Sequence, residues 1–175
     1  MSARSEPEAA SALPSRVEEA IVRANGIELC YQSLGDPEAP AILLVMGLGM
    51  QLVAWPDAFC ERLVGQGFRV IRFDNRDCGH STRIAWGQRP RLLFALLRGA
   101  FGLPVRAPYL LGDMADDAIG LLDALAVARA HVVGVSMGGM IAQCMATRCP
   151  DRLLSLTSIM SASRRCRSAR LPARG

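Results

Sequence analysis

Short apolar runs alternate with amphipathic segments along the chain. Residues 17–24 and 27–33 mix apolar and polar positions and flank Asn25-Gly26, a dipeptide typical of tight hairpin turns. We therefore expect an antiparallel hairpin at the start of the fold. Four later runs are continuously apolar, which is typical of strands buried on both faces, and they cover residues 41–46, 68–73, 130–135 and 153–160.

The segments between these runs have the spacing of helices. Apolar residues recur on one side in residues 57–65, 110–125 and 137–148. Cys149-Pro150 ends the last of these segments, because the residue before a proline resists helical angles. Residues 90–104 are apolar with interspersed arginines, and we interpret them as a short helix or a mobile cap segment.

The order of these elements predicts the fold class. After the hairpin, strands alternate with helices, so we expect an α/β fold with a mostly parallel sheet, helices on both faces and right-handed crossovers. One such domain is expected over residues 17–160. Residues 1–16 are rich in Ser, Ala, Glu and Pro, and residues 161–175 are rich in Arg, so we expect a disordered tail at each end.

The positive charge of the chain belongs to its last residues. The formal net charge is +4, from 20 basic and 16 acidic residues. Five of the basic residues lie within the last twelve positions, namely Arg164, Arg165, Arg167, Arg170 and Arg174. Without them the rest of the chain is close to neutral, so the sequence does not predict a nucleic-acid partner.

Further residue patterns bear on location and cofactors. The longest apolar run, residues 41–50, is too short to span a bilayer, and residues 1–16 lack the core of a secretory signal. We therefore expect a cytoplasmic protein with no membrane partner and no disulfide framework. Cys78 and His80 alone do not make a zinc site, and the glycine-rich loops lack dinucleotide spacing and a phosphate-loop lysine. We predict no metal and no cofactor.

A serine flanked by glycines lies between an apolar run and a helical segment. It matches the G-x-S-x-G pattern as Gly134-Val135-Ser136-Met137-Gly138. A serine on so sharp a turn holds its hydroxyl above the sheet, and the two glycines let the strand and helix backbones approach closely. A Gly-rich packing turn is the alternative. The strand before the motif and the helix after it favour Ser136 as a catalytic nucleophile.

A second glycine-rich loop, Met46-Gly47-Leu48-Gly49, directly follows an apolar run. Acyl transfer places negative charge on a carbonyl oxygen, so the site needs preorganised hydrogen-bond donors. The backbone N–H groups of Leu48 and Met137 are the candidates for this oxyanion hole. An ordinary glycine turn is the alternative, and the position of the loop after an earlier buried strand favours the catalytic interpretation.

Together these stretches resemble the α/β-hydrolase family, and within it the small-molecule esterases that include the aclacinomycin methylesterases. The resemblance spans roughly residues 17–160. It rests on residues 44–47, Trp55-Pro56, residues 73–81 and residues 134–139. It implies a serine that forms an acyl-enzyme with a small carboxylic ester, assisted by an acid and a histidine that follow the serine in the chain.

The chain departs from this family pattern after Ser136. The residues that follow contain one acid, Asp151, and no histidine. His131 precedes the serine on the same strand by about 16 Å, at about 3.3 Å per residue, toward the wrong end of the sheet. His80 lies in a turn at the same edge as Ser136, but its strand is two places away, about 10 Å. We therefore expect an incomplete triad.

The arginine-rich end suggests an explanation for the missing groups. Residues 161–175 have no periodicity, and Leu171 is their only large hydrophobe. We hypothesise a frame shift or premature stop near Ser161, with the carboxyl-terminal strands missing. The strand over residues 153–160 would then have an open edge that favours self-association. A genuine basic tail that binds an acidic partner or a membrane surface is the alternative.

Two functions follow from these patterns. The first is a serine hydrolase of carboxylic esters in which Ser136 attacks a small-molecule ester. The second is a non-catalytic half-domain that acts as an interaction module or is a decayed fragment. A histidine at the carboxyl end of the sheet would distinguish them, and the sequence places none after Ser136.

Overall fold

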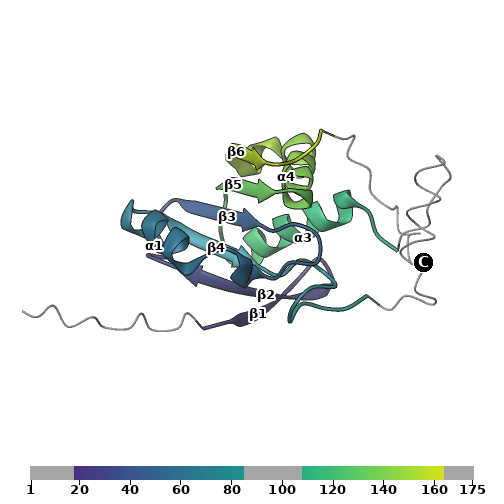
Figure 1. The fold of residues 1–175 in the computed structure, drawn as a ribbon, viewed down its shortest axis with the longest axis horizontal. Coiled ribbons are helices and arrows are strands. Elements are labelled where there is room, and N and C mark those ends of the chain that lie inside the picture. Colours follow the sequence, from purple (N-terminus) through teal and green to yellow (C-terminus); the bar gives the residue numbers. More distant parts are fainter. Residues whose placement is uncertain (1–17, 85–107, 164–175) are drawn as a thin grey trace, which may run out of the picture.

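The computed structural model describes residues 18–84 and 108–163 of the chain. Within these ranges, six strands form one sheet with helices packed against it (Figure 1). The strands are β1 (Ala20–Ala24), β2 (Ile27–Leu34), β3 (Ala41–Val45), β4 (Arg69–Phe73), β5 (Ala130–Val135) and β6 (Leu153–Ile159). The helices are α1 (Asp57–Gly65), α3 (Leu111–Ala124) and α4 (Met137–Arg148), with short 3-10 turns η1 (Leu52–Ala54) and η2 (Pro150–Arg152).

The sheet has the strand order β1-β2-β4-β3-β5-β6. The pairs β1–β2 and β2–β4 are antiparallel, whereas β4, β3, β5 and β6 run parallel. This confirms the predicted mostly parallel α/β sheet with a hairpin at its start. The chain passes from β3 to β4 on one side and later returns to β5 on the other. The carboxyl ends of β3 and β5 therefore lie side by side, at the kind of switch point where α/β sheets bind ligands.

Strand β3 shows why its sequence is continuously apolar. Leu43 and Val45 belong to the core under α3 and α4, whereas Ile42 and Leu44 belong to the core under α1. Successive side chains of a strand point to opposite faces, so a strand covered on both faces needs an apolar residue at every position. The predicted helices on both faces of the sheet are confirmed.

The predicted elements within the described residues are all present. Their bounds agree to within one residue, except that the first strand begins at Ala20 rather than at residue 17. The segment predicted as a short helix or cap, residues 90–104, lies outside the described residues. So do residues 1–16 and all but the first three residues of the predicted tail at 161–175. Among the described residues, no helix is long and apolar enough to cross a membrane.

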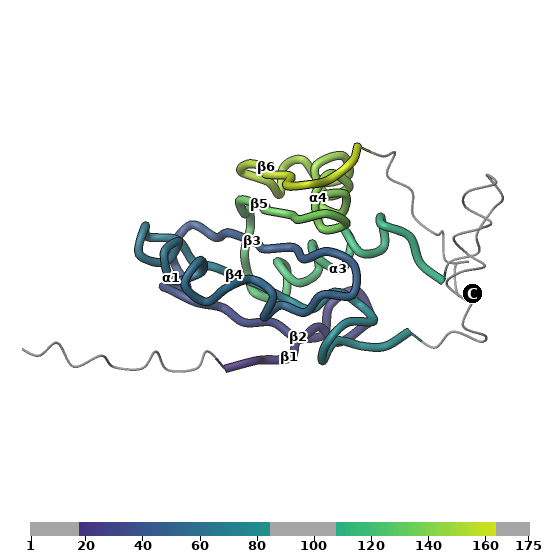
Figure 2. The backbone as a smooth tube through the Cα atoms, in the orientation of Figure 1, coloured from purple at the N-terminus to yellow at the C-terminus, as the bar shows by residue number. Residues whose placement is uncertain are grey.

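Strand β6 corrects one expectation, because it is not buried on both faces. Leu153 is half-buried, but the other residues of β6 are exposed, and Leu154, Leu156 and Ile159 are among the exposed large hydrophobic residues. Figure 2 shows β6 at one end of the sheet and β1 at the other. Its apolar sequence was correctly interpreted as a strand. Burial on both of its faces was wrongly predicted from the apolar run, whereas the open edge expected for this strand agrees with its place at the end of the described sheet.

Candidate active site

Ser136 lies at the junction of β5 and α4 in a left-handed backbone conformation. Its φ is 55° and its ψ is −120°, which is unusual for a residue with a side chain. The Ser136 N–H donates to the carbonyl of Ile159 at 2.9 Å, and its own carbonyl accepts from the Gly139 N–H at 3.0 Å. The residue as a whole is exposed. This is the strained strand-to-helix turn that the G-x-S-x-G pattern predicts.

The glycines of the motif are required by close backbone approaches. A Cβ atom on Gly134 would overlap the backbone of Gly138, and one on Gly138 would overlap the carbonyl of Val45. A Cβ on Gly139 would lie 2.6 Å from the Ser158 hydroxyl oxygen. Helix α4 therefore begins in direct contact with β3, β5 and the end of β6. The spacing of these small residues fixes how Ser136 leaves the sheet.

The loop after β3 runs directly beside the serine. A Cβ on Gly47 would lie 3.3 Å from Ser136 Cβ and 3.8 Å from Ser136 Oγ. The Leu48 side chain points to solvent and is 77% exposed, so the role considered for this residue involves its backbone only. The structure thus brings together the two glycine-rich stretches that carry Leu48 and Met137, the residues considered for the oxyanion hole.

Two polar residues after β4 hold this loop in place. Asn75 Nδ2 donates to the carbonyl of Met46 at 2.9 Å. The carboxylate of Asp74 accepts the N–H of Leu52 at 2.7 Å and the N–H of His80 at 3.0 Å. Both Asp74 and Asn75 are buried. Sequence reasoning used this stretch for the family resemblance and gave it no structural role, although consecutive polar residues directly after a buried strand were a visible signal.

A buried ion pair anchors the same turn to α3. Arg76 donates to both carboxylate oxygens of Asp117, at 2.5 and 2.6 Å, and Asn25 Nδ2 donates to Asp117 at 2.8 Å. The Tyr109 hydroxyl donates to Asp77 at 2.6 Å. Burial raises the pKa of Asp117, and the bonds from Arg76 and Asn25 lower it part of the way back. This network connects the hairpin, α3 and the turn that braces the active-site loop.

The two histidines of the chain have partners away from Ser136. His80 Nδ1 lies 2.7 Å from Glu19 Oε2, and His131 Nδ1 lies 2.8 Å from Ser155 Oγ. His131 is in the first part of β5, away from the elbow at its carboxyl end. Neither ring makes a hydrogen bond to Ser136 among the described residues.

Metal-ligating side chains gather at a place that the sequence did not indicate. Cys78 and His80 were weighed together as ligands, but the Cys78 thiol donates to the carbonyl of Met50 at 3.1 Å. Instead, one ligand atom each from Glu19, Cys30 and His80 lies within 4.8 Å of the other two. Sequence spacing could not reveal this group, because folding brings its members together from three separate segments.

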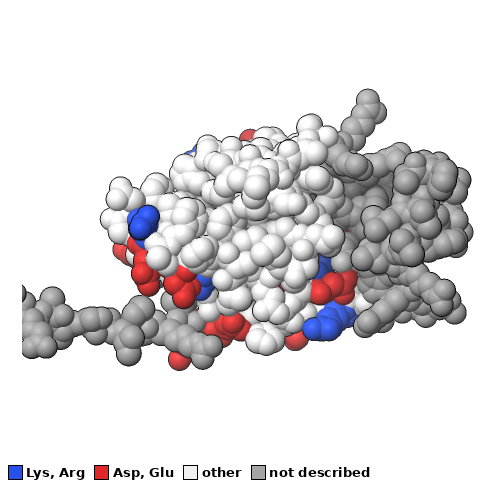
Figure 3. All heavy atoms as spheres, in the orientation of Figure 1, with Lys and Arg blue, Asp and Glu red and all other residues white. Residues whose placement is uncertain are grey.

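Charged side chains do not form a basic patch on the described part of the face shown in Figure 3. Acidic and basic residues lie near one another toward the margins of the described part of that face, and its centre is uncharged. The described part of this face therefore offers no continuous positive surface of the kind that phosphate backbones require.

Known proteins match most of this chain. A sequence model of the alpha/beta hydrolase fold matches residues 40–173. The rhodomycin D methylesterase DnrP of Streptomyces peucetius is 40% identical over 134 residues, which cover 77% of this chain and 39% of that protein. A putative carbamate hydrolase RutD of Variovorax paradoxus is 32% identical over 149 residues, covering 82% of this chain and 48% of that protein.

Solved structures agree with the sequence matches. A hydrolase from Pseudomonas aeruginosa PA01 superposes with a TM-score of 0.60 at 31% identity, covering 79% of this chain and 44% of that one. A bacterial membrane phospholipase A gives a TM-score of 0.67 at 28% identity, covering 91% and 42%. The chain thus spans less than half the length of these relatives. The predicted resemblance to methylesterases of this fold is confirmed, and the chain belongs to the α/β-hydrolase family.

Proposed function

We propose that the chain carries the nucleophile half of a carboxylic-ester hydrolase that acts on a small-molecule ester. Ser136 is the nucleophile, and the N–H groups of Leu48 and Met137 form the oxyanion hole. The observation that carries the proposal is the packing of Gly47 against Ser136 where α4 begins. The methylesterase name of DnrP, at 40% identity, supports an ester as the substrate.

The reaction uses groups on both sides of the switch point. Ser136 Oγ bonds to the ester carbonyl carbon, and the negative charge moves to the carbonyl oxygen. The N–H groups of Leu48 and Met137 donate to that oxygen, which lowers the energy of the tetrahedral intermediate. The Ser136 hydroxyl loses its proton as it attacks, and collapse of the intermediate expels the alkoxide, which takes up a proton and leaves as the alcohol. Water then attacks the acyl group on Ser136, which releases the carboxylic acid and restores the Ser136 hydroxyl.

The least favourable step at this site is the removal of the proton from the Ser136 hydroxyl. A serine needs an adjacent base, and the rings of His80 and His131 are held by Glu19 and Ser155. Losing a triad member leaves roughly 10³–10⁴-fold catalysis over water, from the oxyanion hole and substrate binding. We therefore expect slow ester turnover that still depends on Ser136.

A non-catalytic half-domain is the second candidate. Two observations favour it: the engagement of both histidines away from Ser136, and the exposed apolar residues of β6. In this case the elbow is an inherited packing turn. The chain would then act as an interaction module that binds a partner through its surface, or it would be a decayed fragment.

Hydrolysis of p-nitrophenyl acetate by matched variants separates these functions. The wild-type chain should hydrolyse this ester slowly, and Ser136→Ala should remove the protein-dependent rate. Leu48→Pro deletes one oxyanion donor and should lower the rate by about 10²–10³-fold, whereas Leu48→Ala keeps the N–H and should leave the rate unchanged. Equal rates for the wild type and Ser136→Ala would favour the half-domain. A large loss in Leu48→Ala would contradict the oxyanion assignment.

A further inference from the structure

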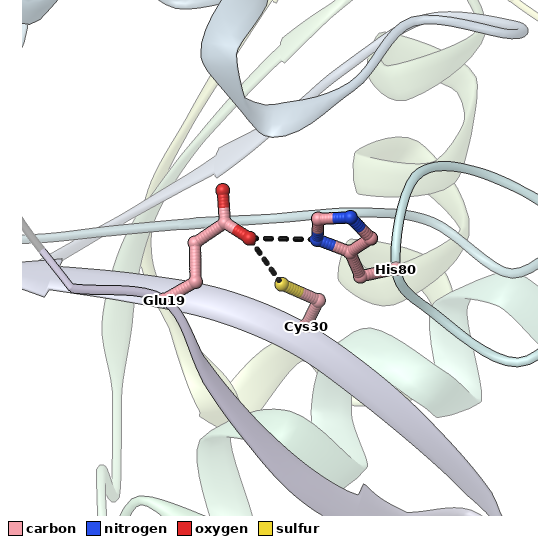
Figure 4. Close-up of side chains that lie close together, drawn as sticks. All are labelled: Glu19, Cys30 and His80. Carbon is pink, nitrogen blue, oxygen red and sulfur yellow. Dashed lines mark hydrogen bonds and ion pairs between the residues drawn. The ribbon is translucent and has the colours of Figure 1, made fainter.

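A second cluster of reactive side chains lies where the start of β1, strand β2 and the turn after β4 meet. Figure 4 shows Glu19, Cys30 and His80 directed toward one another. Glu19 Oε2 lies 2.7 Å from His80 Nδ1 and accepts a hydrogen bond from the Cys30 thiol at 3.5 Å. The function proposed for Ser136 gives these three residues no role.

Buried hydrogen bonds hold the backbone of this cluster. Ser81 Oγ accepts the N–H of Cys30 at 2.9 Å and donates to the carbonyl of Asp74 at 2.6 Å. The Asp74 carboxylate accepts the N–H of His80 at 3.0 Å, and both Asp74 and Ser81 are buried. The backbones of Cys30 and His80 are therefore fixed relative to each other before any ligand binds, which limits how far their side chains must move to form a site.

We propose that Glu19, Cys30 and His80 form a Zn²⁺ site with three protein ligands and an open fourth position for water. Carboxylate oxygen, thiolate sulfur and imidazole nitrogen are all ligands that zinc accepts. With ordinary zinc bond lengths, the ligand atoms of a tetrahedral site lie about 3.3–3.6 Å apart. The sulfur–oxygen pair at 3.5 Å already fits this geometry. The nitrogen–oxygen pair at 2.7 Å would need to open by about 0.6 Å.

Charge in the cluster favours a cation. The Glu19 carboxylate contacts both other members of the cluster, and the metal-free Cys30 thiol donates its hydrogen to that carboxylate. When Zn²⁺ binds, it bonds to the sulfur in place of that proton, which leaves to solvent, and it takes the lone pair of His80 Nδ1. The cation then lies between the carboxylate and the thiolate and offsets their mutual repulsion.

The position of the site gives it a structural consequence. Bound zinc would tie the residue before β1 to β2 and to the turn that contains His80. The same turn includes Asp74 and Asn75, which brace the loop beside Ser136. Zinc binding should therefore stabilise the described domain and the loop of the candidate active site, with no part in the acyl-transfer chemistry.

Cobalt serves as a spectroscopic probe of this site. The untagged full chain, first treated with a chelator, is titrated with Co²⁺, which takes the same ligands and gives a thiolate charge-transfer band. The wild type should show the band, Cys30→Ser should lose it, and His80→Ala should bind at least tenfold more weakly. His131→Ala removes the other histidine and should match the wild type. A band that survives Cys30→Ser, or the absence of a band in the wild type, would overturn the proposal.

Thermal unfolding separates loss of the metal from loss of the fold. Cys30 is buried, but the His80 side chain is 73% exposed, so His80→Ala should keep the fold. Zn²⁺ should raise the Tm of the wild type and of His131→Ala, and at the same metal concentration should raise the Tm of His80→Ala and Glu19→Gln by a smaller amount. Equal Tm shifts in all four proteins, or no shift in the wild type, would contradict the site.

Discussion

Two leucines flank the same residue of the elbow strand and lie in opposite environments. Leu43 of β3 and Leu156 of β6 are both register partners of Val132 in β5. Leu43 is completely buried, whereas Leu156 is 39% exposed. The described sheet is therefore closed on the side of β5 that carries the loop with Gly47, and open on the side that ends at β6 (Figure 1).

This difference separates the contacts that the two neighbouring strands make with the turn at Ser136. The backbone that packs against Ser136 and Gly138 comes from the end of β3 and the loop after it. The turn with Asp74 and Asn75 braces that loop from the same side. The β6 side contributes the carbonyl of Ile159 and the side chains of Ser158 and Ser161, which lie against Gly139 at the start of α4, although β6 itself stays largely exposed. Among the described residues, the loop that packs against Ser136 is therefore held from the β3 and β4 side.

The same substitution on the two sides should have very different effects. Leu43→Ala deletes a fully buried side chain and should lower the free energy of unfolding by about 2–5 kcal/mol. Leu156→Ala truncates an exposed side chain and should cost less than about 1 kcal/mol. Urea unfolding followed by circular dichroism measures both. Equal losses of unfolding free energy in the two variants would mean that β6 is covered in solution. That result would contradict the difference in burial between Leu43 and Leu156.

Two glycines provide a second test of how tightly α4 packs against β3. Gly138→Ala would place a Cβ against the carbonyl of Val45, and we expect it to destabilise the fold by about 1–3 kcal/mol. Gly65→Ala places the same methyl group where nothing lies within 4 Å, and it should be neutral or slightly stabilising. Thermal unfolding of the two variants compares them directly. If Gly138→Ala were as stable as Gly65→Ala, the tight contact between α4 and β3 would be wrong.

These glycines show how much the sequence could predict. Runs of apolar residues located the strands, because a strand covered on both faces leaves no polar position. The spacing of Gly134, Ser136 and Gly138 indicated the elbow, because only small residues allow the backbones to approach so closely. Local pattern was sufficient in both cases, since the constraint acts between residues that are near in sequence or lie within one element.

The sequence could not predict features that depend on which segments meet. The exposure of Leu156 depends on what lies beside β6. An apolar run in the sequence does not show which element, if any, packs against the strand. The bond from Asn75 to Met46 joins residues of two different loops. The approach of Glu19 to His80 joins residues far apart in sequence. Each of these required the three-dimensional arrangement.

The open edge of β6 is also a proposed site of self-association. Its exposed leucines and the outer backbone of an edge strand favour pairing with a second copy, and a charge there should prevent it. We expect sedimentation velocity to show concentration-dependent association of the wild type and a monomeric Leu156→Lys variant. Ile21→Lys places the same charge on the opposite edge strand, β1, and should leave association unchanged. Association lost equally in both variants would contradict a site at β6.

The central claim is that Ser136 is a nucleophile to which neither histidine of the chain is hydrogen-bonded among the described residues. Reaction of the full chain with a fluorophosphonate, followed by peptide mass spectrometry, tests this claim most directly. We predict one slow adduct on Ser136, faster labelling when imidazole supplies a base, and no adduct at this position in Ser136→Ala. An adduct elsewhere in the wild type, or no labelling of Ser136 even with imidazole, would contradict the account.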